Sequence, residues 1–537
     1  MRYFNIAGPN KEEQNFGLDP LKRVDIRMIE SFIARGRHFL LCSPRQSGKT
    51  TFLLAFKKKL NAERAYRCLY CNVEAAQAAG GDSERGIRLL LNRIAQEAAQ
   101  EFQDPRLYQN YHAILERTGP DGAILAVFER WLSEEQPPKP PLVLMLDGID
   151  LLSGRTLTSI LRQLRVGQGS APRLFPQSVI LSAVRDIRDA DVNVGSGEFL
   201  TGRSGTDIRE PSVTLYDFTR AELKELCDQH TAETGQVFQE GVYPRLYALS
   251  GGRPWLVNAL LCEALYEMNY AANPSKPITA AILEAAKDHF IARQDAYLDQ
   301  LATKLSSPQV REVLFPILSG TVWKKKPPQD VLEYLKDLEL IKKFSSGWSL
   351  TNAIAKELIP RVLGRDMRDE LLYVVERGRF IKPDKRLNLL SAIAFYQTLY
   401  RDRCMEWETR YDLKGAFPQI LLQAFLLVVL GDRGRMECEC MLASGRVDIG
   451  VSWFYPVQSG EPREERFIIR LQIFDNSQSQ GDATRSGAAL TAEFAHQRQA
   501  HEAFLLLLDE SSGRTWYDRL YQERHVCLET PIYVFGL

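Results

Sequence analysis

The sequence predicts an α/β fold whose first part is a three-layer core, a parallel sheet with helices on both faces. Three apolar runs of strand length carry this prediction: Phe39–Cys42, Leu142–Asp147 and Ser178–Val184. Buried parallel strands are nearly continuous apolar runs, and here helical patterns separate them. At 537 residues the chain is too long for one hydrophobic core, so we expect several domains.

The first run leads into the polar loop Ser43-Pro-Arg-Gln-Ser-Gly-Lys-Thr50, and a helical pattern over residues 52–60 follows. A phosphate-binding P-loop requires this order of strand, loop and helix. Gly48 lets the backbone approach the phosphates, Lys49 reaches the outer phosphates, and the Thr50 hydroxyl can ligate Mg²⁺. The predicted ATP-binding residues are Ser43, Arg45, Gln46, Ser47, Gly48, Lys49, Thr50 and Thr51.

The loop departs from the full motif at its first position, which is Ser43 instead of the usual Gly. Pro44 follows it and stiffens the backbone. A small residue can still serve at this position, so we expect the loop to bind a nucleotide. A chance Gly-Lys-Thr at a helix start is the alternative, and the strand before it and the helix after it argue against chance.

The run Leu142–Asp147 ends in an acid, as in the second motif of such sites, where a strand-end carboxylate holds Mg²⁺ through water. We therefore expect Asp147 to act with Thr50 at the metal. The next position in additional-strand P-loop ATPases is usually a Glu that polarises the attacking water, and here it is Gly148. Hydrolysis is therefore expected to be slow unless another acid compensates.

Two acids and one arginine are candidates for catalytic roles. Asp150 closely follows the strand, and Glu74 ends a further predicted strand over residues 67–74. The alternative is that neither acid compensates, and ATP is bound but turned over slowly. Arg185 follows the run from Ser178; it either reports the γ-phosphate or is an ordinary solvated arginine.

Composition is that of an ordinary cytoplasmic protein. Lys plus Arg equals Asp plus Glu at 68 each, which gives no global electrostatic case for nucleic acid but leaves a local patch open. The nine cysteines are scattered and no secretory pattern begins the chain, so free thiols are expected. Cys68 and Cys71, three apart on a predicted strand, point to opposite faces and do not converge on a metal. The apolar stretch Ile420–Leu430 is too short to span a bilayer, so no membrane partner is expected.

A helical region follows the predicted sheet. Thr219 and Glu222 form a capping-box pattern that opens a helix. Helical patterns continue to about Arg293 and are interrupted by the turn Gly251-Gly-Arg-Pro-Trp255. Further helical runs are expected at 298–305, 309–318 and 328–338, followed by a wing of two short strands over 340–350.

Three stretches in this order, Pro44–Thr51, Asp147–Asp150 and Gly251–Asn258, resemble bacterial AAA-like ATPases, which are related to STAND ATPases and to origin-recognition-type AAA+ proteins. The resemblance implies that a helical lid and a winged helix follow the ATPase core. It also implies that Pro254 lies close to the nucleotide base. The expected domains are a core over 1–217, a lid over 218–296, a winged helix over 297–365 and a last domain over 366–537.

The predicted winged helix carries lysines that could contact DNA phosphates: Lys324, Lys325, Lys326, Lys342 and Lys343. In the family that the chain resembles, this domain more often packs against the ATPase core as a switch element. A DNA partner, a protein partner and an oligomer are all left open by the sequence.

The last domain resembles the PD-(D/E)xK nuclease core that is often fused to such ATPases. The expected elements are a helix from Pro418, a hairpin strand around Asp448, a strand over 466–474, a helix over 492–503 and strands over 504–509 and 530–535. Such sites bind Mg²⁺ between an Asp and a Glu, with a Lys two residues after the Glu. Here Arg470 takes the Glu position and Gln472 the Lys position, and a cation repels Mg²⁺. We therefore expect an inactive, restriction-endonuclease-like α/β domain that does not cleave DNA.

The main hypothesis is a switch operated by ATP and Mg²⁺, in which closure of the lid rearranges the winged helix and the nuclease-like domain. The alternative is an ATP-dependent nuclease of a mobile-element or phage-defence system, and Arg470 argues against it. A third hypothesis is an interaction scaffold with a vestigial P-loop.

Overall fold

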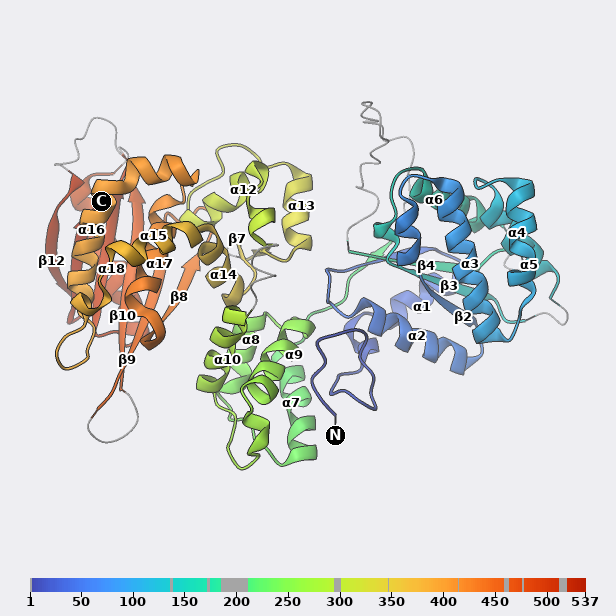
Figure 1. Cartoon of the computed structure of the whole chain (residues 1–537), viewed down its shortest axis with the longest axis horizontal. Coiled ribbons are helices and arrows are strands. Elements are labelled where there is room, and N and C mark those ends of the chain that lie inside the picture. The colour runs from blue at the N-terminus through green and yellow to red at the C-terminus, as the bar shows by residue number, and fades with distance from the viewer. Residues whose placement is uncertain are drawn as a thin grey trace. The chain divides into compact units, whose positions relative to one another are not determined.

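The computed structural model describes residues 2–135, 139–170, 174–184, 211–293, 301–345, 347–413, 415–457, 463–475, 478–510 and 519–537. The chain divides into two compact units, Met1–Ala286 and Lys287–Leu537 (Figure 1). In the described ranges, no helix is long and apolar enough to cross a membrane. All nine cysteines are free thiols.

The first unit contains a five-stranded parallel sheet with the strand order β2-β3-β4-β1-β5. Its strands are β1 (Phe39–Cys42), β2 (Arg67–Asn72), β3 (Leu142–Asp147), β4 (Ser178–Ala183) and β5 (Ser212–Val213). Four of the five were predicted, and the two-residue β5 was not. Because all strands are parallel, their carboxyl ends meet at one edge of the sheet, where ligands bind in open α/β folds.

Helices cover both faces of this sheet, which confirms the three-layer prediction. Figure 1 shows α1 (Ile26–Ala34) and α2 (Lys49–Glu63) on one side and the remaining core helices on the other. Those helices are α3 (Ser83–Phe102), α4 (Arg106–Thr118), α5 (Ala123–Ser133) and α6 (Gly154–Gln168). Alternate strand residues enter separate hydrophobic clusters, so Cys68 packs on the α2 side and Cys71 on the α3 side. The two thiols therefore lie on opposite faces, as predicted.

A helical region completes the first unit. It contains α7 (Arg220–Thr234), α8 (Val242–Ser250), α9 (Pro254–Cys262) and α10 (Ala280–Arg293), whose last residues belong to the second unit. The capping box of Thr219 and Glu222 is present. Between α8 and α9, Gly252 has φ +81°, and a Cβ there would lie 2.1 Å from the Phe218 carbonyl oxygen. Only glycine fits this turn.

The second unit begins with helices and a wing. They are α12 (Pro308–Ser319), α13 (Gln329–Asp337), the strands β6 (Ile341–Phe344) and β7 (Gly347–Leu350), and α14 (Ala353–Leu363). β6 and β7 form an antiparallel pair, and all of these elements except α14, which was not predicted, lie close to the predicted positions.

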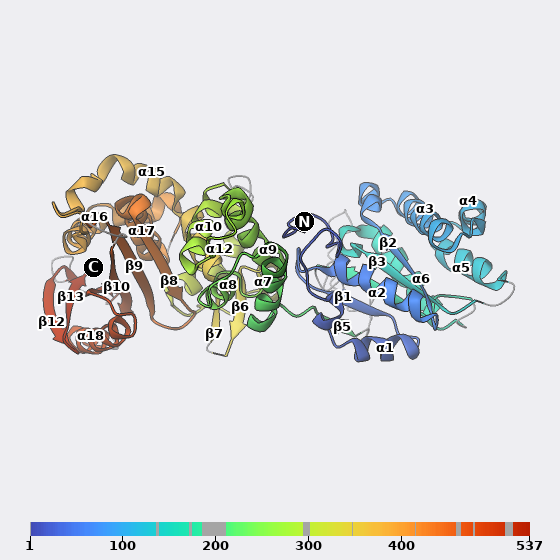
Figure 2. The same ribbon diagram turned by 90° about the horizontal axis from the view of Figure 1, so that it is seen from below.

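The remainder is a mixed six-stranded sheet with helices on both faces, in the order β12-β13-β11-β10-β9-β8. The strands are β8 (Gly434–Cys440), β9 (Arg446–Tyr455), β10 (Arg463–Phe474), β11 (Glu502–Asp509), β12 (Gln522–Cys527) and β13 (Thr530–Gly536). The helices are α15 (Arg365–Val374), α16 (Leu389–Tyr411), α17 (Phe417–Leu430) and α18 (Gln480–Gln497). Figure 2 shows α16 and α17 on one side of the sheet and α18 on the other.

One helix of this part was predicted wrongly. The expected helix over 492–503 is α18, which spans Gln480–Gln497, and β11 already begins at Glu502. Ser479 caps the helix by accepting a hydrogen bond from the Asp482 backbone N–H. The buried face of α18 is made of Ala, Gly and Thr residues, so its first turns give no apolar helical pattern.

The wing and the last sheet are joined within the second unit. Ser349 in β7 forms a β-bridge with Met441, and the Leu442 backbone N–H donates to the Trp348 carbonyl oxygen at 2.9 Å. One hydrophobic cluster runs from Leu301 to Leu537 through both parts. The wing and one face of the last sheet therefore share a hydrophobic cluster, whereas the face covered by α18 has a separate one.

Candidate nucleotide site

The loop between β1 and α2 has the backbone of an anion site. α2 begins at Lys49, after Gly48 with φ +91°, and no side chain caps its first turn. A helix N-terminus without a side-chain cap directs N–H groups and the positive end of its dipole outward. Gln46 also adopts a left-handed conformation, with φ +61°. A bulky residue in that conformation is strained by roughly 1–3 kcal/mol, a feature that concentrates at functional loops.

Thr50 and Asp147 meet at the edge of the sheet. The Thr50 hydroxyl donates to Asp147 Oδ2 at 2.7 Å, and the Tyr70 hydroxyl donates to the same oxygen at 2.9 Å. Asp147 is buried, and it lies beside Ser182 of β4 and Asn72 of β2 across the sheet. A hydroxyl and a carboxylate oxygen side by side are the hard donors that Mg²⁺ prefers. The structure thus brings together the two residues predicted to hold the metal.

Lys49 is turned toward its own loop. Its Nζ donates to the carbonyl oxygens of Ser43 at 2.5 Å and Pro44 at 2.8 Å. Burial lowers the pKa of the Lys49 ammonium, while the charges of Asp147 and Asp150 oppose this effect. To hold a phosphate, the ammonium must exchange these neutral carbonyls for anionic oxygens, which bind it more strongly.

Two hydroxyls near the loop support a polar ligand. Ser47 Oγ and Ser182 Oγ are buried, and neither has a hydrogen-bond partner among the described residues. A buried polar atom without a partner is costly, and in native structures it points to a ligand or a water. Together with Thr50 and Asp147, these atoms form a donor set that fits a nucleotide with Mg²⁺.

The serine at the first loop position has a structural role. Ser43 is 1% exposed, and its hydroxyl accepts the backbone N–H of Leu215 at 2.8 Å. Leu215 belongs to residues 214–218, the connector between β5 and α7. A glycine at position 43 would leave this N–H without its partner. The departure from the usual motif is thus a contact to the connector.

The candidate catalytic acids differ in their surroundings. Asp150 accepts the backbone N–H of Val184 at 3.1 Å, so its carboxylate is engaged in holding the end of β4. Glu74 is exposed and lies two residues after Asn72, the β2 neighbour of Asp147. Gly148, with φ +83°, opens a short 3-10 turn. Arg185 lies outside the described residues.

The helical region and the N-terminal segment both reach the loop. Arg253, just before α9, contacts the Arg45 carbonyl oxygen at 3.5 Å. The Trp255 indole donates to the Ile6 carbonyl oxygen at 3.0 Å, and the Asn10 backbone N–H donates to the Thr51 hydroxyl at 3.1 Å. Pro254 is therefore flanked by two residues that contact the loop or the N-terminal segment beside it.

The chain has distant structural counterparts. A Walker-type ATPase of Pyrococcus abyssi is 17% identical, aligns over 66% of this chain and 99% of its own, and has a TM-score of 0.45. The Holliday junction branch migration motor RuvB of Thermotoga maritima is 16% identical, aligns over 65% of this chain and 97% of its own, and has a TM-score of 0.33. Cdc6p from Pyrobaculum aerophilum is 13% identical, aligns over 68% of this chain and 96% of its own, and has a TM-score of 0.33. No family model and no curated protein matches the chain.

Two residues of the site were not predicted from the sequence. Tyr70 lies inside a strand pattern, and Arg23 lies before the first helix. Arg23 is buried, and its guanidinium donates to the Ser47 carbonyl oxygen in the loop. A polar residue at a buried strand position was the available signal for Tyr70. No local pattern marks Arg23.

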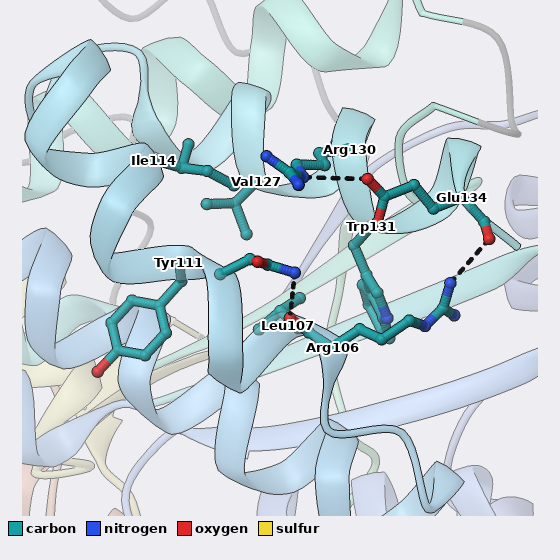
Figure 3. Close-up of a pocket in the computed structure, with 9 residues that line it drawn as sticks. Arg106, Leu107, Tyr111, Ile114, Val127, Arg130, Trp131 and Glu134 are labelled. Atoms are coloured by element: carbon teal, nitrogen blue, oxygen red, sulfur yellow. Dashed lines mark hydrogen bonds and ion pairs between the residues drawn. The ribbon is translucent and has the colours of Figure 1, made fainter.

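A pocket elsewhere in the core carries no comparable chemistry. It lies between α4 and α5 and is lined by Leu107, Ile114, Val127 and Trp131 with arginines at its rim (Figure 3). Arg130 pairs with Glu134 at 3.0 Å and Arg106 with Asp104 at 2.6 Å. Because its cations already have partners, the pocket offers no free charge to a ligand.

The residues that the nuclease resemblance singles out are also in contact. Arg470 in β10 lies opposite Asp448 in β9, with Nε 2.5 Å from Oδ1 and Nη2 3.0 Å from Oδ2. Both residues are buried. Among the described residues, no group of three or more His, Cys, Asp or Glu side chains is placed to hold a metal. The Asp448 carboxylate is therefore neutralised by a two-point ion pair.

Proposed function

We propose that the first unit binds ATP with Mg²⁺ at the loop over residues 43–50 and works as a nucleotide-operated switch. The observation that carries this proposal is the 2.7 Å contact between the Thr50 hydroxyl and Asp147 Oδ2. It joins the first residues of α2 to the end of β3, 97 positions away, at the site where a P-loop protein holds its metal.

Each residue of the loop has a definable task in binding. The backbone N–H groups that begin α2 face the phosphates, and Lys49 moves from the Ser43 and Pro44 carbonyls to the outer phosphate oxygens. Thr50 and Asp147 hold Mg²⁺, directly or through water. Bound Mg²⁺ supplies positive charge that neutralises the phosphates. We propose that Thr51 and Pro254 face the nucleoside end of the ligand.

Hydrolysis is proposed to be slow. Gly148 has no side chain to polarise water, and the carboxylate of Asp150 already accepts the Val184 N–H. Glu74 is the other candidate acid, and it is exposed to solvent. A fast ATPase places a well-oriented base beside the attacking water.

We further propose that α7 to α9 act as a lid whose position depends on the nucleotide. Arg253 contacts the loop, and the N-terminal segment links Trp255 to Thr51. A ligand drives a conformational change only if it binds the two states with different affinity. Contacts that join the loop and the lid can provide such a difference.

For the second unit we propose a winged helix joined to an inactive nuclease-like domain that binds a partner. The ion pair with Arg470 occupies the Asp448 carboxylate, and a cation at this position opposes Mg²⁺. The predicted winged helix carries exposed Lys325 and Lys326 between α12 and α13 and exposed Lys343 in β6, and these cations favour a polyanion such as DNA. Because the wing and one face of the nuclease-like sheet share a hydrophobic cluster, we propose that they move together.

The Mg²⁺ dependence of ATP binding tests the proposed site. Titration with a fluorescent ATP analogue is expected to give tighter binding with Mg²⁺ than with EDTA. Asp147→Asn should remove most of this gain, because it takes away the anionic oxygen next to Thr50, and Thr50→Val should do the same. Asp121→Asn, at an exposed acid just before α5, is the control. A wild-type chain that binds ATP equally with and without Mg²⁺ contradicts the assignment.

A further inference from the structure

Arg23 is a buried cation between the loop and the connector over residues 214–218. It is 6% exposed and ends a short 3-10 helix, Pro20–Arg23. Its Nη1 donates to the Ser47 carbonyl oxygen, and its Nε donates to the Tyr216 carbonyl oxygen at 2.8 Å. The guanidinium also lies over the Phe218 ring, 5.2 Å from the ring centroid.

The partners of Arg23 are neutral. Its hydrogen bonds go to backbone carbonyls, and among the described residues no ion pair neutralises it. Burial lowers the pKa of this guanidinium to about 10, against the opposing charges of Asp217 and Glu222, so it stays charged at neutral pH. A Cβ at Gly48 would lie 2.9 Å from Arg23 Nη1, so the cation is directly behind the residue that precedes α2. Its positive potential favours an anion in the loop.

The connector continues this contact to the lid. The Tyr216 backbone N–H donates to the Arg23 carbonyl oxygen at 2.9 Å, so the two residues are bonded twice. Two residues later, the Phe218 backbone N–H donates to the Gly252 carbonyl oxygen at 2.7 Å, in the turn before α9. A continuous series of hydrogen bonds thus leads from Ser47 in the loop to the turn that precedes Pro254.

The planar guanidinium suits this position. Its N–H groups form a rigid fork that can donate to two carbonyls in different segments at once. A lysine would keep the charge but has one flexible ammonium, which cannot fix both segments in the same geometry. The guanidinium thus adds a rigid side-chain link between the loop and the connector to the contact that Ser43 makes with Leu215.

We propose that Arg23 is the positioning residue that couples occupancy of the loop to the position of the lid. This inference rests on the proposed nucleotide binding and adds the element that transmits it. Arg23 touches neither the nucleotide nor the metal, and it acts through the Ser47 and Tyr216 carbonyls.

Hydrogen exchange of the full chain tests the coupling. Exchange in peptides from α7 to α9 is compared with and without ATPγS and Mg²⁺, at matched occupancy measured by titration of each variant. The wild type should show nucleotide-dependent protection of the lid. Arg23→Met should lose most of this protection even when saturated, and Arg23→Lys should lose a large part of it although it keeps the charge. Lys22→Ala, an exposed neighbour, should respond as the wild type does.

The outcomes separate this inference from the proposed function. A wild type that binds no ATPγS overturns the nucleotide site itself. A wild type that binds, together with Arg23 variants that protect the lid as fully as the wild type, overturns the coupling alone. If Arg23→Met does not fold, Arg23→Lys distinguishes the outcomes. The proposal predicts that this variant loses a large part of the lid protection, and full protection in it overturns the coupling.

Discussion

Asp147 Oδ2 accepts hydrogen bonds from both Thr50 and Tyr70, which fixes the carboxylate before any metal binds. Burial raises the pKa of the Tyr70 hydroxyl, and the charge of Asp147 adds to the effect, so Tyr70 remains a donor at neutral pH. A donor that orients a metal-holding carboxylate is worth about 10–100-fold in metal affinity.

Tyr70→Phe should therefore raise the Mg²⁺ concentration needed for half-maximal ATP binding by about tenfold, while ATP binding in EDTA changes little. The measurement is a Mg²⁺ titration at fixed ATP analogue. Tyr108→Phe, at an exposed position on α4, is the matched control. Equal Mg²⁺ requirements for Tyr70→Phe and the wild type would show that the hydroxyl does not orient Asp147.

The contacts that local patterns did not reveal share one property: the two residues that form each contact are distant in the sequence. Tyr70 is 77 positions from Asp147, Ser43 is 172 from Leu215, and Arg23 is 193 from Tyr216. Lys49, Thr50 and Asp147 could be predicted because backbone geometry imposes a recognisable local pattern on them. The contacts of Ser43 and Arg23 depend on tertiary packing, which a single sequence does not express.

At the level of elements, the predicted winged helix presents basic side chains at two places. Lys325 and Lys326 are exposed between α12 and α13, and Lys343 is exposed in β6. The other edge of the wing is occupied, since Ser349 in β7 bonds to the turn between β8 and β9. Nucleic acid would therefore approach the wing from the β6 side.

A duplex DNA titration tests whether the lysines of the predicted winged helix bind DNA. Lys325→Glu combined with Lys326→Glu should weaken binding at low salt by about tenfold and make its salt dependence shallower, because fewer phosphates are neutralised. Fluorescence anisotropy of a labelled duplex measures both quantities. Lys385→Glu, an exposed lysine before α16, is the control. If DNA binding is unchanged in the double variant of Lys325 and Lys326 but lost in Lys385→Glu, the DNA interface lies elsewhere on the chain.

The elements themselves were predictable to different degrees. The core strands and α7 carried strong apolar or capping patterns and lie where expected. α4 was missed, and α18 was placed too late in the chain. The buried face of α18 includes Ala483, Gly487 and Thr491. Such small residues pack closely against a sheet but give no helical pattern of large apolar residues in the sequence.

At the scale of the whole molecule, the candidate sites of the two units differ in the partners of their aspartates. In the first, the Thr50 hydroxyl and the Asp147 carboxylate are brought together beside the loop, whereas in the second the Asp448 carboxylate is paired with Arg470. Removing one partner of a buried ion pair is costly, by roughly 3–5 kcal/mol. The Asp448–Arg470 pair therefore contributes to the fold of the last sheet, which is a role unlike that of a nuclease centre.

DNA digestion is the corresponding test. The full chain with Mg²⁺ or Mn²⁺ should leave linear and supercoiled DNA intact, with or without ATP. Asp448→Ala should lower the melting temperature, because it leaves the Arg470 guanidinium buried without its partner. Metal-dependent cleavage that disappears in Asp448→Ala would establish the alternative, an ATP-dependent nuclease.

The central claim is that the loop over residues 43–50 binds ATP, and Lys49→Ala tests it most directly. Equilibrium binding of ATP to the full chain is measured for the wild type, Lys49→Ala and the control Lys58→Ala, an exposed position on α2. Loss of a charge-assisted contact to phosphate, worth about 1.5–3 kcal/mol, should weaken binding by roughly tenfold or more. Lys58→Ala should bind as the wild type does. Unchanged affinity in Lys49→Ala would contradict the nucleotide site.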